Sequence, residues 1–346
     1  MSVVSVPPLD LPRLGVWLET AVPSFRGLRQ ATRVVGGNCN PIWLLSANSG
    51  RYILRTQPAG TLLRSAHALD RETRVIQALS ASDVPVANIH VLCSDLDVIG
   101  VQFYLMDYVE GEVHRDPRMP DLVPSQRTAL YNVAIDMLAR INTLDVDGLK
   151  LRDFGRPGHY FQRQMHRWTR QYRTSLPDGD LATDSLIAAL ERAMPDDDQP
   201  PMLLHGDARL DNLMFARGAA RIVAVFDWEL STLGHPLADL GQFLGVQALP
   251  ADYLMPGLAG IDRRALGIPT IEAQASRYFS ATGLPPRNLR FYQGFALFRQ
   301  AAMAAGLKRR AELGTAVNET ALIFGNTLDV FARAGLQILE GTTHEF

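Results

Sequence analysis

The first third of the chain alternates short apolar runs with polar turns, a pattern typical of β-strands. In TRVVGGNCNPIWLLSANSGRYILRT (32–56), apolar runs flank a polar turn at 47–50, which predicts two paired strands. The run VIGVQFYLMDYVEG (98–111) predicts a further strand that ends in an acidic, glycine-containing turn. Between them, residues 62–79 carry apolar positions at helical spacing. We therefore expect a small mixed sheet with one helix packed on it.

Beyond residue 112 the spacing of apolar positions becomes helical. The segment SQRTALYNVAIDMLARINTL (125–144) predicts a helix capped by Ser125, and a second helix is expected over 160–172. One strand-like run, IVAVFDW (222–228), interrupts a region that otherwise predicts helices separated by proline and glycine. The pattern predicts an α+β chain with an N-terminal lobe at 1–109, a hinge near 106–111 and a larger, mainly helical lobe at 112–346.

Composition narrows the class of protein without naming a function. The 346 residues are 47% hydrophobic and 20% charged, with a formal net charge of −2, so charge gives no case for binding nucleic acid or a membrane surface. No run of roughly 18 apolar residues and no signal peptide is evident, which makes the cytoplasm the expected location. Cys39 and Cys93 lie far apart and are expected to be reduced thiols. The oligomeric state stays open.

The candidate chemistry begins in LLHGDARLDNLMF (203–215), where polar residues sit on a short corner between apolar flanks. Asp207 can orient a hydroxyl group and accept its proton. Asn212, five residues on, and Asp227, at the end of the next strand, offer the oxygen ligands that Mg²⁺ prefers. Positioning of a nucleophile and screening of phosphates by a cation are what phosphoryl transfer requires. A hydrolytic metal site would show more histidines than the single His205.

These residues also carry a resemblance to a known family. HGDARLDN followed by VFDWE resembles the catalytic loop and metal-binding segment of the aminoglycoside phosphotransferase family, which is related to protein kinases. The longer string FDWELSTLGHPLADL is similar to the branch that includes kinase-like domains fused to acyl-CoA dehydrogenases. The resemblance covers nearly the whole chain and implies a protein-kinase-like fold of two lobes.

The resemblance also implies roles for individual residues. Asp207 would be the catalytic base, and Asn212 and Asp227 would bind Mg²⁺, with Glu229 assisting a second ion. His205 and Asp239 would hold the loop and strand in place by hydrogen bonds. The phosphoryl donor would be ATP or GTP.

On the nucleotide side, Gly36 and Gly37 lie between predicted strands, where backbone amides can approach phosphates. No Walker-type phosphate loop is present. The next strand carries Arg55 and the following helix Glu72, the order of the cation and carboxylate that pair in kinase-like folds; the alternative is two unrelated surface charges. The hinge would bind adenine, although the same residues suit an ordinary buried edge strand. The remaining nucleotide contacts that we expect are Asn38, Asn40, Met106, Asp107 and Val109.

The acceptor is predicted from charge. Two segments carry arginines without any carboxylate, 159–173 and 273–311, which suits an anionic small molecule such as a CoA thioester. The alternative is that acids elsewhere in the chain neutralise them. The resembling branch is implicated in phosphorylating hydroxyacyl-CoA. An aminoglycoside or amino-alcohol kinase, or a nucleotide-binding protein without catalysis, remains the other interpretation. The candidate acceptor residues are Arg163, Arg167, Arg170 and Arg299.

Overall fold

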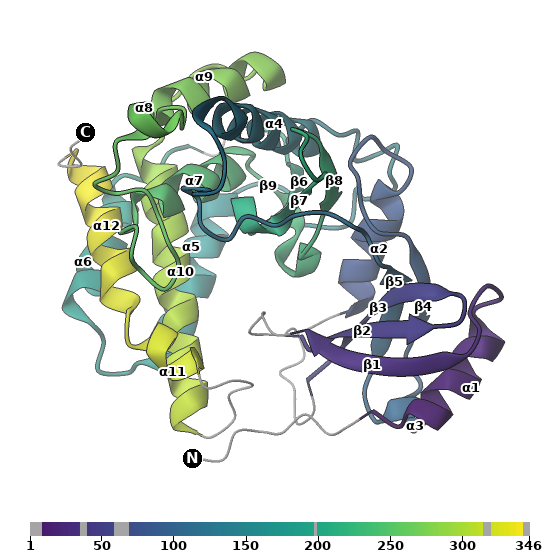
Figure 1. Ribbon diagram of the computed structural model, residues 1–346. Coiled ribbons are helices and arrows are strands. Elements are labelled where there is room, and N and C mark those ends of the chain that lie inside the picture. The colour runs from purple at the N-terminus through teal and green to yellow at the C-terminus, as the bar shows by residue number, and fades with distance from the viewer. Residues whose placement is uncertain (1–8, 35–39, 59–68, 197–198, 314–319, 342–346) are drawn as a thin grey trace.

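The structure is a computed structural model that describes residues 9–34, 40–58, 69–196, 199–313 and 320–341, arranged in two lobes (Figure 1). The N-terminal lobe is built on a five-stranded sheet in the order β1-β2-β3-β5-β4, and each neighbouring pair is antiparallel. The predicted turn at 47–50 joins β2 to β3. The predicted combination of sheet and helix is confirmed, but the sheet is antiparallel where a mixed sheet was expected. Its strands are β1 Leu28–Val34, β2 Ile42–Ala47, β3 Gly50–Thr56, β4 Ile89–Cys93 and β5 Phe103–Asp107.

Three helices belong to this lobe. The helix α1 (Leu11–Ala21), which the sequence analysis did not anticipate, begins where the Asp10 carboxylate accepts a hydrogen bond of 3.1 Å from the Arg13 N–H. It packs its buried leucines on one core with the short α3 (Leu96–Ile99). The helix α2 (Leu69–Leu79) corresponds to the helix predicted over 62–79, whose first seven residues lie outside the described residues.

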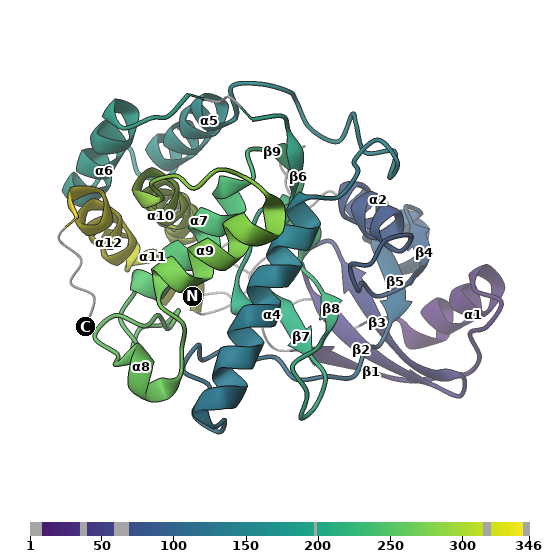
Figure 2. The same ribbon diagram turned by 90° about the horizontal axis from the view of Figure 1, so that it is seen from above.

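The C-terminal lobe surrounds a small strand region with helices, as Figure 2 shows from above. Two short antiparallel pairs, β6 with β9 and β7 with β8, present the corner at 203–215. The strands are β6 Met202–Leu204, β7 Leu213–Phe215, β8 Ile222–Val225 and β9 Thr232–Gly234. Short 3₁₀ turns lie at η1 Leu210–Asn212, η2 Trp228–Leu230 and η3 Val246–Ala248. The helices are α4 Pro124–Asn142, α5 Tyr160–Ser175, α6 Leu181–Arg192, α7 Leu237–Gly245, α8 Arg263–Leu266, α9 Ile271–Thr282, α10 Arg290–Glu312, α11 Thr320–Gly325 and α12 Leu328–Glu340.

The start of α4 differs from the prediction. Ser125 does not cap the helix, because Pro124 is its first residue and Val123 occupies the cap position. The Gln126 side chain instead accepts the Val123 N–H at 3.1 Å. Proline favours this first position because its φ is already helical and it has no N–H to satisfy.

The lobe boundary at 109–112 stays a prediction. The last strand of the sheet ends at Asp107, and Glu112 already exchanges two backbone hydrogen bonds of 2.8 Å with Phe215 of β7.

No helix within the described residues combines the length and the apolar character needed to cross a bilayer.

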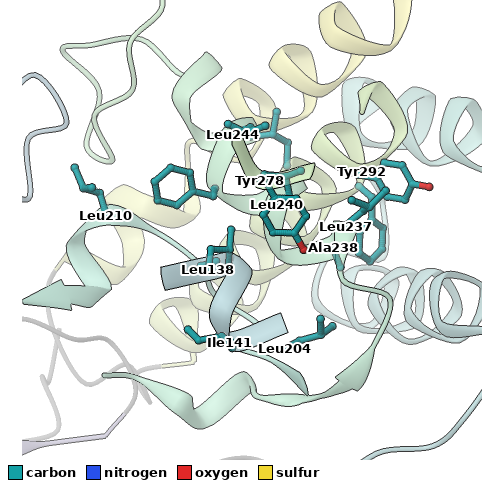
Figure 3. Close-up of a cluster of buried hydrophobic side chains, with 14 of the residues drawn as sticks. Leu138, Ile141, Leu204, Leu210, Leu237, Ala238, Leu240, Leu244, Tyr278 and Tyr292 are labelled. Carbon is teal, nitrogen blue, oxygen red and sulfur yellow. The ribbon is translucent and has the colours of Figure 1, made fainter. Parts of the chain in front are cut away.

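The helix α7 lies at the centre of the C-terminal core. All nine of its residues are buried, and leucines on it pack against α4, α9 and α10 (Figure 3). At Gly241 a Cβ would lie 2.5 Å from the Tyr292 backbone, so glycine is required for α7 to approach α10 this closely. Two polar residues of this apolar helix, Asp239 and Gln242, are therefore held deep in the lobe, directly behind the corner at 203–215.

Candidate active site

The loop between β6 and η1 carries the predicted catalytic residue. Pairing of β6 with β9 and of β7 with β8 fixes both ends of this loop, and Phe226 N–H donates to the Asn212 carbonyl at 3.2 Å. Gly206 adopts φ +88°, and a Cβ there would lie 2.2 Å from the Leu230 carbonyl oxygen. Only glycine fits this conformation without strain. The sequence H-G-D thus specifies a tight corner that carries Asp207, and the charges of Asp207 and Asp227 both act on Arg209.

A buried carboxylate holds this corner from behind. Asp239 accepts the backbone N–H of His205 at 2.7 Å and that of Gly206 at 2.9 Å. The Asn142 amide donates to the same carboxylate at 3.1 Å and accepts the Tyr278 hydroxyl at 2.8 Å. These contacts satisfy the buried charge and rigidify the loop.

The His205 ring braces the next strand. Its Nδ1 accepts the Asp207 N–H at 3.2 Å, and its Nε2 lies 2.9 Å from the Phe226 carbonyl, so the tautomer protonated on Nε2 satisfies both contacts. The ring also packs on Trp228, with centroids 4.7 Å apart. His205 and Asp239 therefore make the contacts that supporting residues would make.

Asp207 is fixed by two glutamines that the sequence analysis did not identify. Gln242 and Gln300 point their Nε2 atoms at Asp207 Oδ1, at 3.2 and 3.5 Å. Asn212 Nδ2 lies 3.3 Å from Oδ2, and Arg209 Nε lies 3.5 Å from it. A signal was available in LADLGQFLG (237–245), because a polar amide one turn after Asp239 in an apolar helix needs a partner.

Arg55 joins the two lobes. Its guanidinium lies 3.3 Å from the Glu72 carboxylate, 2.8 Å from that of Asp227 and 3.0 Å from that of Glu229. The Arg55 and Glu72 side chains are 7% and 1% exposed, so the alternative that they are unrelated surface charges is wrong. Asn40 also reaches this group, with Nδ2 3.2 Å from Glu229 Oε2.

This network shifts the protonation of its members. Burial alone would raise the pKa of the Asp227 carboxyl, but Arg55 outweighs burial and brings the pKa below its usual range. Burial raises the pKa of Glu72 to about 7, because Arg55 offsets only part of the desolvation. Burial would lower the pKa of Arg55, yet the surrounding carboxylates raise it, so Arg55 stays charged.

The donor set is suited to Mg²⁺. Within the described residues no three His, Cys, Asp or Glu side chains converge as a metal cluster. Mg²⁺, however, commonly uses one or two carboxylates with waters and substrate phosphates. Asn212 Nδ2 is bound to the Asp207 carbonyl at 2.9 Å, which turns its amide oxygen away from that loop. Asn212, Asp227 and Glu229 could therefore supply the hard oxygen ligands of such an ion.

Part of the predicted nucleotide site is described. Gly36, Gly37 and Asn38 lie outside the described residues. Met106 faces Ile53 within the sheet, and the Asp107 N–H donates to the Asn88 carbonyl at 3.0 Å. The N–H of Asp107 is therefore already used within the lobe. The expected adenine contacts of Met106, Asp107 and Val109 stay predictions.

The predicted acceptor arginines separate into two groups. Arg299 is buried and donates to the Gly206 carbonyl at 2.6 Å, so it supports the catalytic loop and does not fit the expected contact with an acceptor. Arg163 donates to the carbonyls of residues 156 and 157. Two other arginines of these segments are neutralised by acids, Arg173 by Asp184 and Arg277 by Asp136.

Arg167 and Arg170, on α5, form the second group. Burial and the charges of Arg299, Arg170 and Arg71 lower the pKa of Arg167. Arg167 and Arg170 are exposed, and of the arginines whose charges act on Arg167, Arg299 contacts the catalytic loop at the Gly206 carbonyl.

Residues 30–277 match the family described as the phosphotransferase enzyme family. The chain is 40% identical over 298 residues to mouse acyl-CoA dehydrogenase family member 10, covering 86% of this chain and 28% of that protein. It is 34% identical over 339 residues to human acyl-CoA dehydrogenase family member 11, covering 96% of this chain and 43% of that protein. The chain thus spans less than half the length of these relatives.

Solved structures show the same fold. A provisionally assigned aminoglycoside phosphotransferase from Ralstonia eutropha superimposes with a TM-score of 0.83 at 37% identity, covering 96% of this chain and 99% of that one. A thermostable mutant of aminoglycoside phosphotransferase APH(4)-Ia, in complex with ADP and hygromycin B, gives a TM-score of 0.61 at 14% identity, covering 92% and 97%. The second likeness shows the fold alone.

Proposed function

The chain belongs to the phosphotransferase enzyme family and is a small-molecule kinase, and from this premise we propose that it phosphorylates the hydroxyl group of a hydroxyacyl-CoA. One structural observation favours an anionic acceptor over the other acceptor classes. Arg167 and Arg170 are exposed on α5, and the charges of Arg71 and Arg299 act on Arg167. Arg299 contacts the catalytic loop, so the positive charge near this loop favours a polyanion. The relatives named for acyl-CoA dehydrogenases favour the same acceptor class.

The proposed chemistry is a single displacement at phosphorus. Asp207 accepts the proton of the acceptor hydroxyl while that oxygen attacks the γ-phosphorus of the nucleotide. The bond from the γ-phosphorus to the β–γ bridging oxygen breaks, and the nucleoside diphosphate leaves with that electron pair. The glutamine amides at Oδ1, and the Asn212 and Arg209 side chains at Oδ2, hold the Asp207 carboxylate in one orientation for the incoming hydroxyl.

The donor would be ATP or GTP bound between the lobes. Arg55, held by Glu72, would contact its phosphate oxygens once they displace the carboxylates of Asp227 and Glu229 from the guanidinium. Mg²⁺, when bound by Asn212, Asp227 and Glu229, supplies charge screening for the triphosphate. Asn40 would support Glu229 through its hydrogen bond.

The test is a panel of acceptors measured by mass gain of one phosphoryl group. The panel contains 3- and 4-hydroxyacyl-CoA esters, the corresponding free hydroxy acids, kanamycin-type aminoglycosides and choline. Phosphorylation of the CoA esters is the expected result. Preference for the aminoglycosides or choline would establish the cationic acceptor as the substrate class instead.

The role of the arginine cluster needs a matched pair of variants. Arg167→Gln with Arg170→Gln should raise KM for the CoA ester about tenfold at low salt, with kcat little changed. Arg152→Gln with Arg333→Gln removes the same charge from exposed positions and should leave KM unchanged. Equal KM values in both double variants would contradict the assignment.

A further inference from the structure

A cavity of about 1310 Å³ opens on the C-terminal lobe. Its lining comes from the end of α7 with η3, from α8 and α9, from the first turn of α10 and from the end of α12. Figures 1 and 2 show α8 and α9 on the side of this lobe away from the five-stranded sheet. The helix α7 separates it from the catalytic loop, because Gln242 reaches Asp207 whereas Leu244 and Gln247 line the cavity. Within the part of the chain that the structure describes, none of the predicted catalytic, metal or nucleotide residues lines it. It is therefore a separate feature of the molecule.

The floor of this cavity is apolar. It is formed by side chains that belong to the main core and are themselves largely buried: Leu244, Leu258, Ala275, Phe279 and Ile338. Such a floor accepts an alkyl chain, since each CH₂ removed from water contributes about 0.8 kcal/mol. A purely polar ligand would gain nothing from this surface.

The rim carries positive charge. Among the described residues, four arginines and one acid, Glu272, line the cavity; the arginines are Arg263, Arg264, Arg287 and Arg290. Arg263 and Arg264 belong to α8, and Arg287 and Arg290 lie at or just before the start of α10, so two segments at least 23 residues apart converge here. This excess of guanidinium groups favours a carboxylate or phosphate, which accepts paired hydrogen bonds from them.

One of these arginines is held in place by a buried amide pair. Arg263 donates to Gln247 Oε1 at 2.8 Å. Gln247 and Gln274 donate to each other at 3.0 and 3.1 Å, and both are almost fully buried. A guanidinium oriented before a ligand arrives loses less entropy on binding. The amide pair therefore gives the rim a fixed point.

We propose that this cavity binds an anionic amphiphile, with a carboxylate or phosphate monoester head at the arginine rim and an alkyl chain on the apolar floor. Typical small-molecule sites measure roughly 300 to 1,000 Å³, so the volume is ample for such a ligand. The inference does not depend on the acceptor proposed above, because the two sites share no residue.

The experiment is calorimetric titration of the full chain at low ionic strength, with octanoate, octyl phosphate and octyltrimethylammonium as separate probes below their micelle concentrations. Binding of one equivalent of octanoate or octyl phosphate, and not of the cation, is expected; which anion binds more tightly identifies the head group. Absence of binding by both anions, or equal binding of the cation, overturns the proposal.

Two variants locate the bound probe. Arg264→Gln with Arg290→Gln should weaken binding at least about tenfold, or about 1.4 kcal/mol. Ser276→Trp, at an exposed lining position, should block the cavity and abolish binding. Unchanged affinity in both variants would overturn the assignment.

Two controls separate this site from the active site. Arg152→Gln with Arg333→Gln, both outside the cavity, should bind the anion as the wild type does. Saturating nucleotide with Mg²⁺ should not displace the probe, and competitive displacement would place the probe in the catalytic cleft and refute a separate site. Thermal unfolding midpoints verify that each variant is folded.

Discussion

The Arg55 guanidinium lies 2.8 Å from the Asp227 carboxylate, although 172 residues separate them in the chain. Arg55 belongs to β3 of the N-terminal sheet, and Asp227 directly follows β8 of the C-terminal lobe. Asp227 also adopts φ +67°, a left-handed conformation that few residues other than glycine accept readily. The contact thus ties the lobes together at a strained strand end, with Glu72 and Glu229 on the same guanidinium.

Replacing Arg55 should destabilise the protein by about 3 kcal/mol, because Arg55→Met leaves the buried Glu72 carboxyl and the partly buried Asp227 carboxylate without their cation. The variant Glu72→Gln removes one of these uncompensated charges. The double variant Arg55→Met with Glu72→Gln should therefore lose less free energy of unfolding than the two single variants lose in sum. Urea unfolding of the four proteins measures this coupling, and strictly additive losses would contradict it.

Glu72 should make stability fall as pH rises toward neutrality. Burial raises the pKa of Glu72 from 4.5 to about 7. Between these two pH values the folded protein keeps a proton on Glu72 that the unfolded chain has already lost. This contribution is fully present below pH 4.5, is lost as pH rises through 7, and is at most about 3 kcal/mol.

The measurement compares unfolding midpoints of wild type and Glu72→Gln from pH 4.5 to pH 8. The midpoint of wild type should fall relative to that of the variant across this window. Asp227 acts in the opposite sense, because its lowered pKa gives stability that is lost only as pH falls below the ordinary carboxyl range. Parallel curves for the two proteins would show that Glu72 does not titrate there.

Asp207→Asn should reduce kcat for phosphoryl transfer by a factor on the order of 10² to 10⁴, the usual contribution of a general base. Nucleotide affinity should change little, because the variant keeps the Arg55 network intact. Turnover assays with and without acceptor, together with a direct nucleotide-binding titration, measure both quantities. Equal turnover in wild type and variant would remove Asp207 from the chemistry and favour a non-catalytic nucleotide-binding protein.

Gln242→Met should lower kcat about tenfold with little effect on stability. Its Nε2 donates to Asp207 Oδ1, and its own Oε1 is buried without a hydrogen-bond partner among the described residues. A methionine of similar size therefore removes an unsatisfied atom together with the hydrogen bond. The loss should appear equally in kcat and kcat/KM, with KM little changed, because the amide orients the carboxylate that accepts the proton.

The matched control is Gln300→Met, whose contact with Oδ1 is longer at 3.5 Å and whose effect should be smaller. The kcat and KM values, measured with the unfolding midpoint, decide between positioning and general structural damage. An unchanged kcat in Gln242→Met, with a lowered unfolding midpoint, would indicate that Gln242 serves the core only.

Structural features that depend on residues close together in the sequence were predicted well. The corner at Gly206, the turn between β2 and β3, and the helix α4 follow from backbone preferences and from the spacing of apolar positions over a few residues. The cap of α4 was misassigned even so, because a proline and a serine compete for the same first turn and only the folded backbone shows which one begins the helix.

The sequence by itself determined the two-lobed phosphotransferase fold and the order of Arg55, Glu72, Asp207 and Asp227 along it, since motifs and hydrophobic periodicity are properties of neighbouring residues. Beyond the expected pair of Arg55 and Glu72, only the tertiary structure decided which distant side chains meet. Arg299 supports the Gly206 carbonyl, Gln242 reaches Asp207, and four rim arginines converge on a remote cavity. The physical reason is that a long-range contact depends on the packing of whole helices, and no spacing within one segment encodes its partner.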